Sequence, residues 1–351
     1  MPAHKIILTV LKGMMLAAAF VVLWLVLRGV GLRNVFEAMR SVDRTSLAAS
    51  AALFFAVFWC WTLRWQQIMK PQSRPNLLAL FPIFMAGVFG NLVSPGALVG
   101  SEPIRAYYMS KVFGGDKAGH FGTALADKFT YTVVFVAFLL VSVVFIIIYV
   151  PVALASKVVM GGAVVLVVAA VISGFLLREH IGARVGLLAR LMPGFYNSWL
   201  MRGLRRRFPT YQHFEDYAIR KLGSIWEPIA SAAGSPRVIA RVSVLAALSW
   251  LIWCTANYVL FRALGADISF VGVFIIATLS TTVGDVSVSP GGAGFTEAVM
   301  IGLCAAFGLD SRTAAAVTLI SRGIFYFYGF VLGGSCIVAL SLIYGRRPAR
   351  Q

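Results

Sequence analysis

Long apolar runs separated by short polar segments constrain this chain more than any other feature of its sequence. An apolar helix needs roughly 20 residues to cross a bilayer. Runs near or above that length occupy about residues 8–27, 46–63, 119–149, 152–177, 242–264 and 312–343. The 351-residue chain is 60% hydrophobic and only 13% charged, whereas soluble domains average about 25% charged residues. We therefore expect a single membrane domain over 1–351, an all-α polytopic protein with about six full spans.

The N-terminus resembles a signal peptide, because Lys5 precedes an apolar run. The run is too long for a signal core and contains Lys12, and no small-residue cleavage site closes it before Arg28. We expect it to be retained as the first span. The four cysteines all lie in apolar segments without CxxC spacing, which favours packed thiols over a disulfide or metal framework.

A short stretch that breaks helices occurs twice. Residues 94–102 read SPGALVGSE and residues 289–297 read SPGGAGFTE, so Ser-Pro-Gly and the final Glu recur at an offset of 195 residues. The flanking segments 77–104 and 268–308 are otherwise apolar, and each is predicted to be a broken or re-entrant helical hairpin. The same offset relates residues 46–149, which we define as repeat one, to residues 242–343, which we define as repeat two.

Cations in the connecting segments predict the orientation. Residues 178–241 hold eleven Lys or Arg residues interleaved with aromatics, which is typical of a basic amphipathic linker on an anionic cytoplasmic leaflet. With that linker inside, both termini are cytoplasmic in a cell membrane. The net charge of +18 then reflects loop orientation and attraction to anionic lipids. Nucleic-acid binding is disfavoured, since most cations flank hydrophobic segments.

This topology predicts that the repeats are inverted. The first hairpin has both ends on the cytoplasmic side, and three spans separate it from the second. The second hairpin therefore has both ends on the outer side. Inverted repeats with discontinuous helices that meet at the bilayer midplane are a recurrent plan of transporters.

The chemistry of the repeated stretch favours a site, although a simple hinge or kink is the alternative. Proline removes a backbone donor and glycine permits positive φ, so irregular backbone at membrane depth survives only inside protein or along a wet cavity. Ser101 and Thr296 are expected to cap the restarting helices, with Glu102 and Glu297 in the first turn. The candidate hinge residues are Pro95, Gly100, Pro290 and Gly294.

Four of the 13 acidic residues lie at membrane depth or its border and are candidates for charge coupling: Glu102, Asp127, Asp285 and Glu297. Ionisable groups at such depth usually mark a pathway, a proton relay or an ion pair. Lys128 follows Glu102 by 26 residues, and Arg322 follows Glu297 by 25. The alternative is two structural salt bridges, Glu102 with Lys128 or Arg105 and Glu297 with Arg322.

The candidate substrate-binding residues are Asn91, Ser94, Gly96, Arg105, Lys128, Ser289, Gly291, Gly292 and Arg322. Asn91 and Asp285 each follow a glycine shortly before a Ser-Pro-Gly, where they could cap the preceding half-helix or contact a headgroup. The tyrosines near these motifs, Tyr131 and Tyr326 among them, are more typical of interface anchors or packing. The histidines lack metal-ligand spacing, no P-loop is present and no nucleophile has a recognisable base, so no catalytic residue, metal or cofactor is predicted.

These residues resemble a known family. Two signatures of the lysylphosphatidylglycerol synthase transmembrane-region family resemble stretches of this sequence. The first is similar to Gly90-Asn91-Leu92 together with Pro95, Gly100, Glu102, Arg105 and Asp127-Lys128. The second is similar to residues 289–297 together with Arg322. Lys128 stands where the family often carries arginine, and no C-terminal aminoacyl-transferase domain follows. The resemblance implies the translocating half of such proteins, as in stand-alone, flippase-like members.

Three functions follow as hypotheses. The first is a lipid translocase that moves an amphiphilic lipid, with an anionic headgroup, by alternating access at the repeat interface. The second is a lipid-modifying enzyme or the membrane partner of a lipid-synthesising enzyme. The third is an ion-coupled transporter of small solutes. In the first, membrane lipids are the partners, cations and helix N-termini hold the headgroup, and the acids balance charge or bind a proton or a cationic group.

Overall fold

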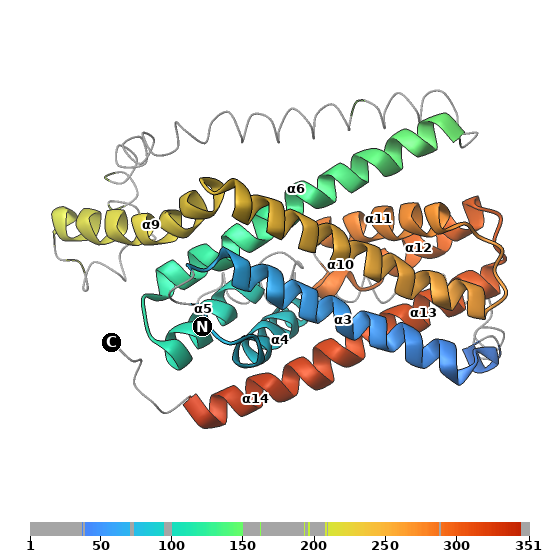
Figure 1. Ribbon diagram of the computed structural model, residues 1–351, viewed down its shortest axis with the longest axis horizontal. Coiled ribbons are helices and arrows are strands. Elements are labelled where there is room, and N and C mark those ends of the chain that lie inside the picture. Colours follow the sequence, from blue (N-terminus) through green and yellow to red (C-terminus); the bar gives the residue numbers. More distant parts are fainter. Residues whose placement is uncertain are drawn as a thin grey trace, which may run out of the picture.

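The computed structural model describes residues 37, 39–70, 74–94, 100–149, 210–287 and 289–344, with 162, 193, 196 and 208. Every regular element in these ranges is a helix (Figure 1), so the all-α fold is confirmed for the part that is described. The spans predicted at 8–27 and 152–177 lie outside the described residues.

Among the described residues, four long helices are apolar enough to cross a membrane. They are α3 (Arg44–Ile68), α6 (Lys117–Tyr149), α10 (Pro236–Ala263) and the continuous run of α13 (Ser311–Phe327), the π-helical η4 (Tyr328–Leu332) and α14 (Gly333–Tyr344). They match the spans predicted at 46–63, 119–149, 242–264 and 312–343. Helix α10 begins six residues before the predicted span, because the Ser235 hydroxyl caps Val238 N–H and a proline occupies the first turn.

Two broken hairpins lie between these spans. The first consists of α4 (Leu77–Val93) and α5 (Ser101–Phe113), and the second of α11 (Phe270–Val286), the 3₁₀ turn η3 (Pro290–Gly292) and α12 (Phe295–Ala306). Helices α4 and α11 have 17 residues each, or about 26 Å at 1.5 Å per residue. That is shorter than the roughly 30 Å hydrocarbon core. The predicted interruptions at both Ser-Pro-Gly stretches are confirmed.

Corresponding helices in the two halves have similar lengths. Helices α3 and α10 have 25 and 28 residues, α5 and α12 have 13 and 12, and α6 has 33 against 34 in the run from Ser311 to Tyr344. Helices α3 and α10 also lie side by side through the middle of the molecule (Figure 1). The Ser50 hydroxyl donates a hydrogen bond of 3.0 Å to the Ala256 carbonyl. The Phe54 and Trp253 rings pack edge to face, with 4.8 Å between their centres.

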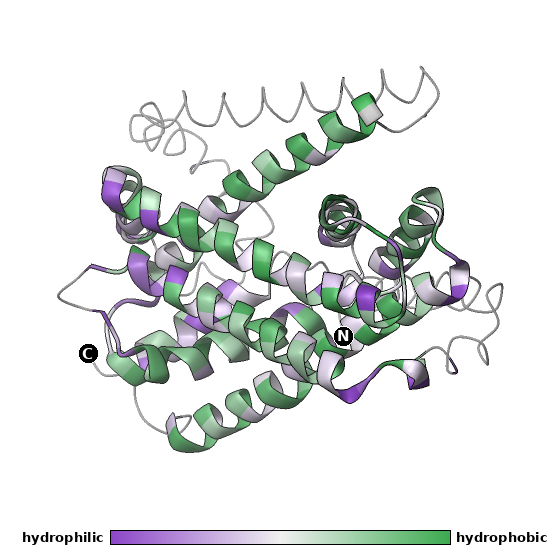
Figure 2. Ribbon diagram, turned by 45° about the vertical axis from the view of Figure 1, so that its right-hand side comes forward, coloured by the Kyte–Doolittle hydropathy of each residue, from purple (hydrophilic) through white to green (hydrophobic). Residues whose placement is uncertain are grey.

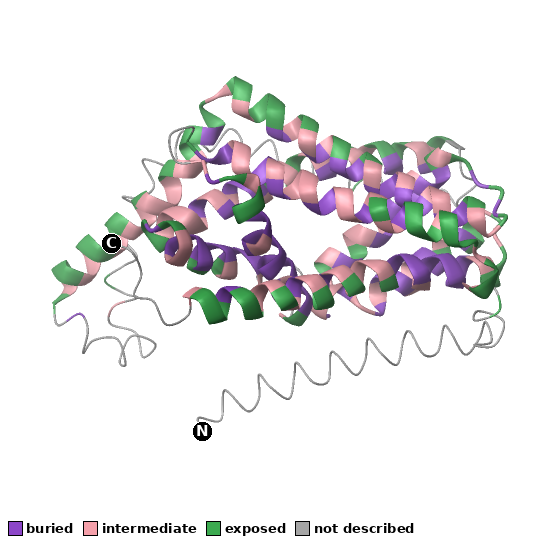
Figure 3. Cartoon of the chain, turned by 60° about the horizontal axis from the view of Figure 1, so that its bottom comes forward, coloured by how far each residue is buried: buried purple, intermediate pink, exposed green. Residues whose placement is uncertain are grey.

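The outer faces of the long helices are hydrophobic. In Figure 2, α14 and the far end of α6 are coloured largely as apolar along their outward sides. Exposed residues there include Val141, Val144 and Ile148 of α6 and Val338 and Leu342 of α14. Figure 3 shows buried residues where helices face one another and exposed residues along their outer sides. An apolar exterior is what lipid contact requires.

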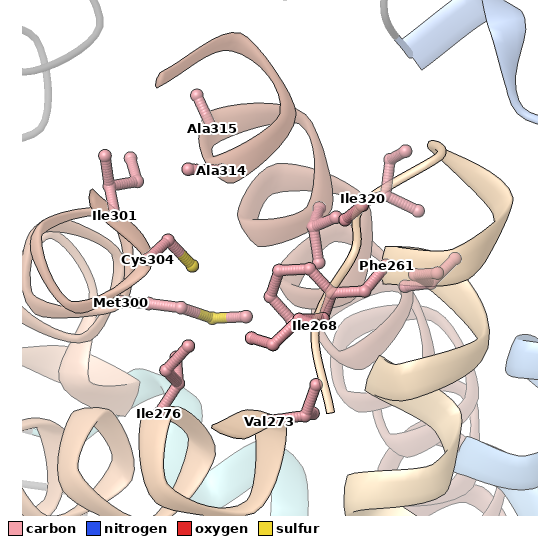
Figure 4. Packing of buried hydrophobic residues seen from close by; sticks show 13 residues of the cluster. Phe261, Ile268, Val273, Ile276, Met300, Ile301, Cys304, Ala314, Ala315 and Ile320 are labelled. Atoms are coloured by element: carbon pink, nitrogen blue, oxygen red, sulfur yellow. The ribbon is translucent and has the colours of Figure 1, made fainter. Parts of the chain in front are cut away.

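A tight apolar cluster holds the second hairpin against α10 and α13. Figure 4 shows Met300 and Cys304 of α12 directed into a cluster to which α10 contributes Phe261 and α13 contributes Ala314 and Ala315. All five residues are buried. The small alanines let α12 and α13 approach closely, which is how helices associate where lipid supplies no hydrophobic driving force. The second hairpin is thus fixed along α12.

Helix α9 (Tyr211–Ala233) lies within the predicted basic linker and packs along α6 (Figure 1). The Lys221 ammonium lies 2.5 Å from the Asp116 carboxylate. Partial burial alone would raise the pKa of Asp116, but the hydrogen bond from Lys221 and other donors lower it below its ordinary value. Residues 236–241, at the end of the predicted linker, lie in the first turns of α10.

Each hairpin closes through a glycine contact that leaves no room for a side chain. A Cβ on Gly90 would lie 2.7 Å from the Gly100 carbonyl oxygen, and a Cβ on Gly284 would collide with the Thr296 hydroxyl. The Gly100 oxygen belongs to the backbone, so a side chain at position 90 would force the backbone itself to move, whereas at position 284 the Thr296 side chain would have to give way. The two halves of each hairpin therefore touch through glycine.

Replacing Gly90 with alanine is expected to lower the free energy of unfolding by about 1–3 kcal/mol, because the added methyl group overpacks the first hairpin. The measurement is equilibrium unfolding of the purified protein in detergent. Gly302→Ala is the matched control, since nothing lies within 4 Å of its Cβ position, and helix propensity predicts an unchanged or slightly raised stability. Equal stabilities for the two variants would contradict the close contact.

Candidate functional site

A cavity of about 390 Å³ lies where the two broken hairpins meet. Its walls come from α4 and α5 of the first hairpin, from α11, η3 and α12 of the second, and from α3, α6, α10 and α13. Aromatic and apolar side chains dominate the lining, and charged side chains interrupt them on several helices. Concave, mostly apolar sites with a few polar groups are typical of ligand binding.

Two arginines share one carboxylate at the inner wall of the cavity. Arg64 of α3 and Arg105 of α5 lie 2.7 and 3.0 Å from separate oxygens of Asp127 on α6. All three residues are at most 5% exposed. The Arg105 guanidinium lies 3.9 Å from the ring centre of Trp65, and that of Arg64 lies 5.0 Å from the ring centre of Tyr131. One negative charge thus compensates two positive charges, and the cluster has a net charge of +1.

The arginines of this cluster keep unused donors. Arg64 Nη1 and Arg105 Nε are buried and have no hydrogen-bond partner among the described residues. A buried N–H left unpaired costs about 1–3 kcal/mol, so such groups in a native site call for an explanation. An anionic ligand oxygen would supply the missing acceptor.

A second ion pair lies next to this cluster. Lys128 Nζ is 2.8 Å from Glu102 Oε1, which decides between the two predicted partners of Glu102 in favour of Lys128. Arg105, the other candidate, pairs with Asp127 instead. The Lys128 side chain is 24% exposed, whereas that of Arg105 is 4% exposed. Lys128 is therefore the most accessible of these cations.

The third pair holds the break of the second hairpin. Arg322 Nε lies 2.7 Å from Glu297 Oε1, as predicted, and its Nη2 donates to the Gly291 carbonyl at 2.7 Å. Glu297 Oε2 accepts the Gly294 backbone N–H at 2.6 Å. The Tyr326 hydroxyl accepts from Arg322 and donates to Glu297 at 3.1 Å. The irregular backbone at 291–294 is thus satisfied by side chains, as burial in an apolar bundle requires.

Asp285, the fourth predicted acid, lines the cavity near the end of α11. No hydrogen bond or ion pair joins its carboxylate to any described residue, and it interacts electrostatically with Arg322 and Lys128. Glu102, Asp127 and Glu297 each accept a hydrogen bond from a cation. Asp285 is therefore distinct among the four.

The predicted capping roles are wrong. Gly100 and Gly294, not Ser101 and Thr296, are the N-cap residues of α5 and α12. Gly294 has φ 85°, which favours glycine, and the Thr296 hydroxyl donates back to the Gly292 carbonyl at 3.0 Å. Ser101 is instead the first helical residue of α5.

Asn91 does not cap the half-helix before it. Its Oδ1 accepts the Ser101 backbone N–H at 2.8 Å, so it caps the following helix across the break. The side chain also lines the cavity, as do Gly291, Arg105, Lys128 and Arg322. Asn91 therefore fixes the start of α5 from within the site.

The other predicted binding and hinge residues lie in the breaks and outside the lining. Ser289 is buried and hydrogen-bonds Ser287 at 2.9 Å, and the buried Ser94 hydroxyl has no partner among the described residues. The remaining members of this group are Gly100, Pro290, Gly292 and Gly294, none of which is among the described lining residues. Pro95 and Gly96 lie outside the described residues.

Arg64 is the main charged residue that sequence reasoning missed. The span predicted at 46–63 ends just before it, but α3 continues to Ile68 and buries it. The need of Asp127 for a buried cation was the available signal. Tyr131 and Tyr326 were interpreted as anchors or packing, yet Tyr131 lines the cavity and Tyr326 bridges Glu297 and Arg322.

A family model described as "Lysylphosphatidylglycerol synthase TM region" matches residues 10–333. The chain belongs to this family. The matched range contains both hairpins and every residue that lines the cavity. Membership confirms the resemblance suggested by the motifs and indicates a multi-pass membrane protein with a lipid-related role.

Several relatives are similar over nearly their whole length. A UPF0104 membrane protein of Methanothermobacter thermautotrophicus is 25% identical over 341 residues, which cover 95% of each chain. UPF0104 membrane proteins of Pyrococcus horikoshii and Methanocaldococcus jannaschii are 24% and 23% identical, covering 88% and 91% of this chain and 91% and 92% of theirs. The names of these relatives describe membrane proteins, in agreement with the apolar helices of this family member.

Proposed function

We propose that this protein is a lipid translocase that moves an amphiphilic lipid with an anionic headgroup between leaflets. One observation carries the proposal: four cationic side chains line a cavity enclosed by apolar helices, where two broken hairpins meet. Ligand sites measure about 300–1,000 Å³. A volume of about 390 Å³ suits a phosphate-bearing headgroup.

The rim of the cavity supports a binding mode in which the headgroup lies inside the cavity and the acyl chains lie outside it. Thr132 of α6 and Val286 at the end of α11 both line the cavity and are exposed. Val136 and Leu139 continue the lining along α6. A headgroup inside would thus leave its acyl chains beyond an apolar rim, in contact with lipid.

The charged wall offers contacts for an anion. Arg64 and Arg105 have spare donors beside a single shared carboxylate. Lys128 is partly exposed and can reorient from Glu102 toward a ligand. Charge-assisted hydrogen bonds of this kind are about twice as strong as neutral ones. Arg322 also lines the cavity, but its donors already hold the second hairpin.

Alternating access is supported by the matched halves. Equal lengths of α4 and α11, and a close glycine contact across the break in each hairpin, fit two repeats of one plan. We propose six spans in total, both termini in the cytoplasm of a cell membrane, and hairpins entered from opposite sides. Rocking of one repeat against the other would expose the cavity to each leaflet in turn.

Reconstituted protein tests the proposal. Vesicles with fluorescent phosphatidylglycerol or phosphatidylcholine are treated with a membrane-impermeant quencher, and the rate of lipid exchange between leaflets is measured. We expect faster exchange of the anionic lipid than in protein-free vesicles. Lys128→Met should slow it by about tenfold or more, because the loss of a hydrogen-bonded charge typically costs 2–5 kcal/mol.

Lys70→Met is the matched control, since Lys70 pairs with Glu227 where both side chains are at least 60% exposed. It should exchange lipid as fast as the wild type. Exchange no faster than in protein-free vesicles, for every headgroup tried, would refute translocation. A chemically altered lipid recovered from the vesicles would instead indicate the enzyme hypothesis.

A further inference from the structure

The charges that line or support the cavity balance when all are ionised. The cations are Arg64, Arg105, Lys128 and Arg322, and the acids are Glu102, Asp127, Asp285 and Glu297. Entry of a singly charged anion would leave one uncompensated negative charge among apolar helices. Unpaired charges at membrane depth are costly, so a compensating positive charge should enter with the ligand.

Three of the four acids cannot readily take up that charge. Asp127 accepts hydrogen bonds from two arginines, and Glu102 accepts one from Lys128. Glu297 accepts from Arg322 and from the Gly294 backbone. Protonating any of them would leave a buried cation without its partner, which costs about 3–5 kcal/mol. Asp285 accepts no such bond from a described residue.

We propose that Asp285 is the proton-coupling group of the translocase, and that it binds one proton for each singly charged headgroup that enters. This inference rests on the proposed function and adds the energy source of lipid transport, which is a proton gradient. The carboxylate takes the proton from water on the side where the headgroup enters and becomes a neutral carboxylic acid. The proton returns to water on the opposite side when the headgroup leaves, so the cavity is neutral in both states.

The groups around Asp285 fit this role. Lys128 and Tyr131 face it from α6 and Arg322 faces it from α13, while α10 presents the indoles of Trp250 and Trp253 to the cavity. On α12, Glu297 is engaged by Arg322. Burial disfavours the charged form of Asp285, and in the empty cavity the two cations oppose that effect. An arriving anion draws Lys128 toward itself and adds a negative charge near Asp285, and both effects favour the protonated acid.

Proton uptake on ligand binding is the direct test. The protein in detergent, in weakly buffered solution, is titrated with dioctanoyl phosphatidylglycerol while the pH is recorded and tryptophan emission reports binding. We expect about one proton to be taken up per lipid bound, by linkage between the two sites. Asp285→Asn should bind the lipid without proton uptake, and Asp285→Glu should retain uptake. Asp267→Asn, which changes an exposed acid, should behave as the wild type.

A transport assay completes the test. A pH gradient across reconstituted vesicles should drive phosphatidylglycerol toward one leaflet for the wild type and not for Asp285→Asn. Lipid binding without proton uptake, or uptake that persists in Asp285→Asn, would overturn the role of Asp285 and leave translocation standing. Neither binding nor exchange of any lipid would overturn the proposed function itself. Dioctanoyl phosphatidylcholine, which is zwitterionic, should bind without proton uptake.

Discussion

Replacing Asp127 with asparagine should destabilise the protein more than any other single change considered. The substitution leaves Arg64 and Arg105 buried without a counter-charge, although both are at most 5% exposed. Removing one partner of a buried ion pair typically costs 3–5 kcal/mol, and here one substitution removes the partner of two cations. We expect a large fall in the denaturant midpoint of unfolding in detergent, with a loss of monodisperse protein on size exclusion.

Glu227→Gln is the matched control for Asp127→Asn. It breaks the Lys70–Glu227 pair at the same short separation of 2.7 Å, but those side chains are 60% and 65% exposed. Exposed pairs contribute about 0–1 kcal/mol. If both variants unfolded at similar denaturant concentrations, burial of the Asp127 cluster would be refuted.

The Glu297–Arg322 pair should show strong non-additivity. Glu297→Gln leaves the Arg322 charge without its counter-ion, and Arg322→Met removes the cation from Glu297 and the donor from the Gly291 carbonyl. Each single change is expected to cost about 3–5 kcal/mol. The double variant removes both charges and should be more stable than the sum of the single effects predicts.

A double-mutant cycle measures this coupling. Contacting residues show interaction free energies of about 0.5–3 kcal/mol, whereas distant sites add within about 0.5 kcal/mol. A cycle between Glu297→Gln and Glu227→Gln provides the additive reference, because the second site is an exposed pair elsewhere. Additive effects in the Glu297–Arg322 cycle would show that the pair does not hold the second hairpin.

Much of the described fold could be predicted because hydrophobicity and helix breakers act locally. The four long helices follow from apolar runs, and both interruptions follow from Ser-Pro-Gly. Glu297 with Arg322 could be paired from their spacing, since α12 and α13 are consecutive helices joined by a short turn. Local signals specify such neighbours.

The rest of the site depends on contacts between distant helices. Arg64 and Asp127 are 63 residues apart, and only the packing of α3 against α6 brings them together. The N-caps were mispredicted because a glycine occupies each cap position instead of the hydroxyl residue that propensity favours. Gly100 is required by the close backbone approach at the first break, and Gly294 by its positive φ at the second. Tertiary constraints overrode local preference at both breaks.

The pairing of α3 with α10 has a consequence for biosynthesis. Helix α3 begins at residue 44 and its partner begins at residue 236, so the ribosome completes the two far apart in time. Translation proceeds at about 5–20 residues per second, so roughly 10–40 s pass between the synthesis of α3 and that of α10. The face of α3 that packs against Ala256 and Trp253 lacks these partners until then. During that interval it contacts lipid or an insertion factor. The bundle can therefore close only late, after the second half has been made.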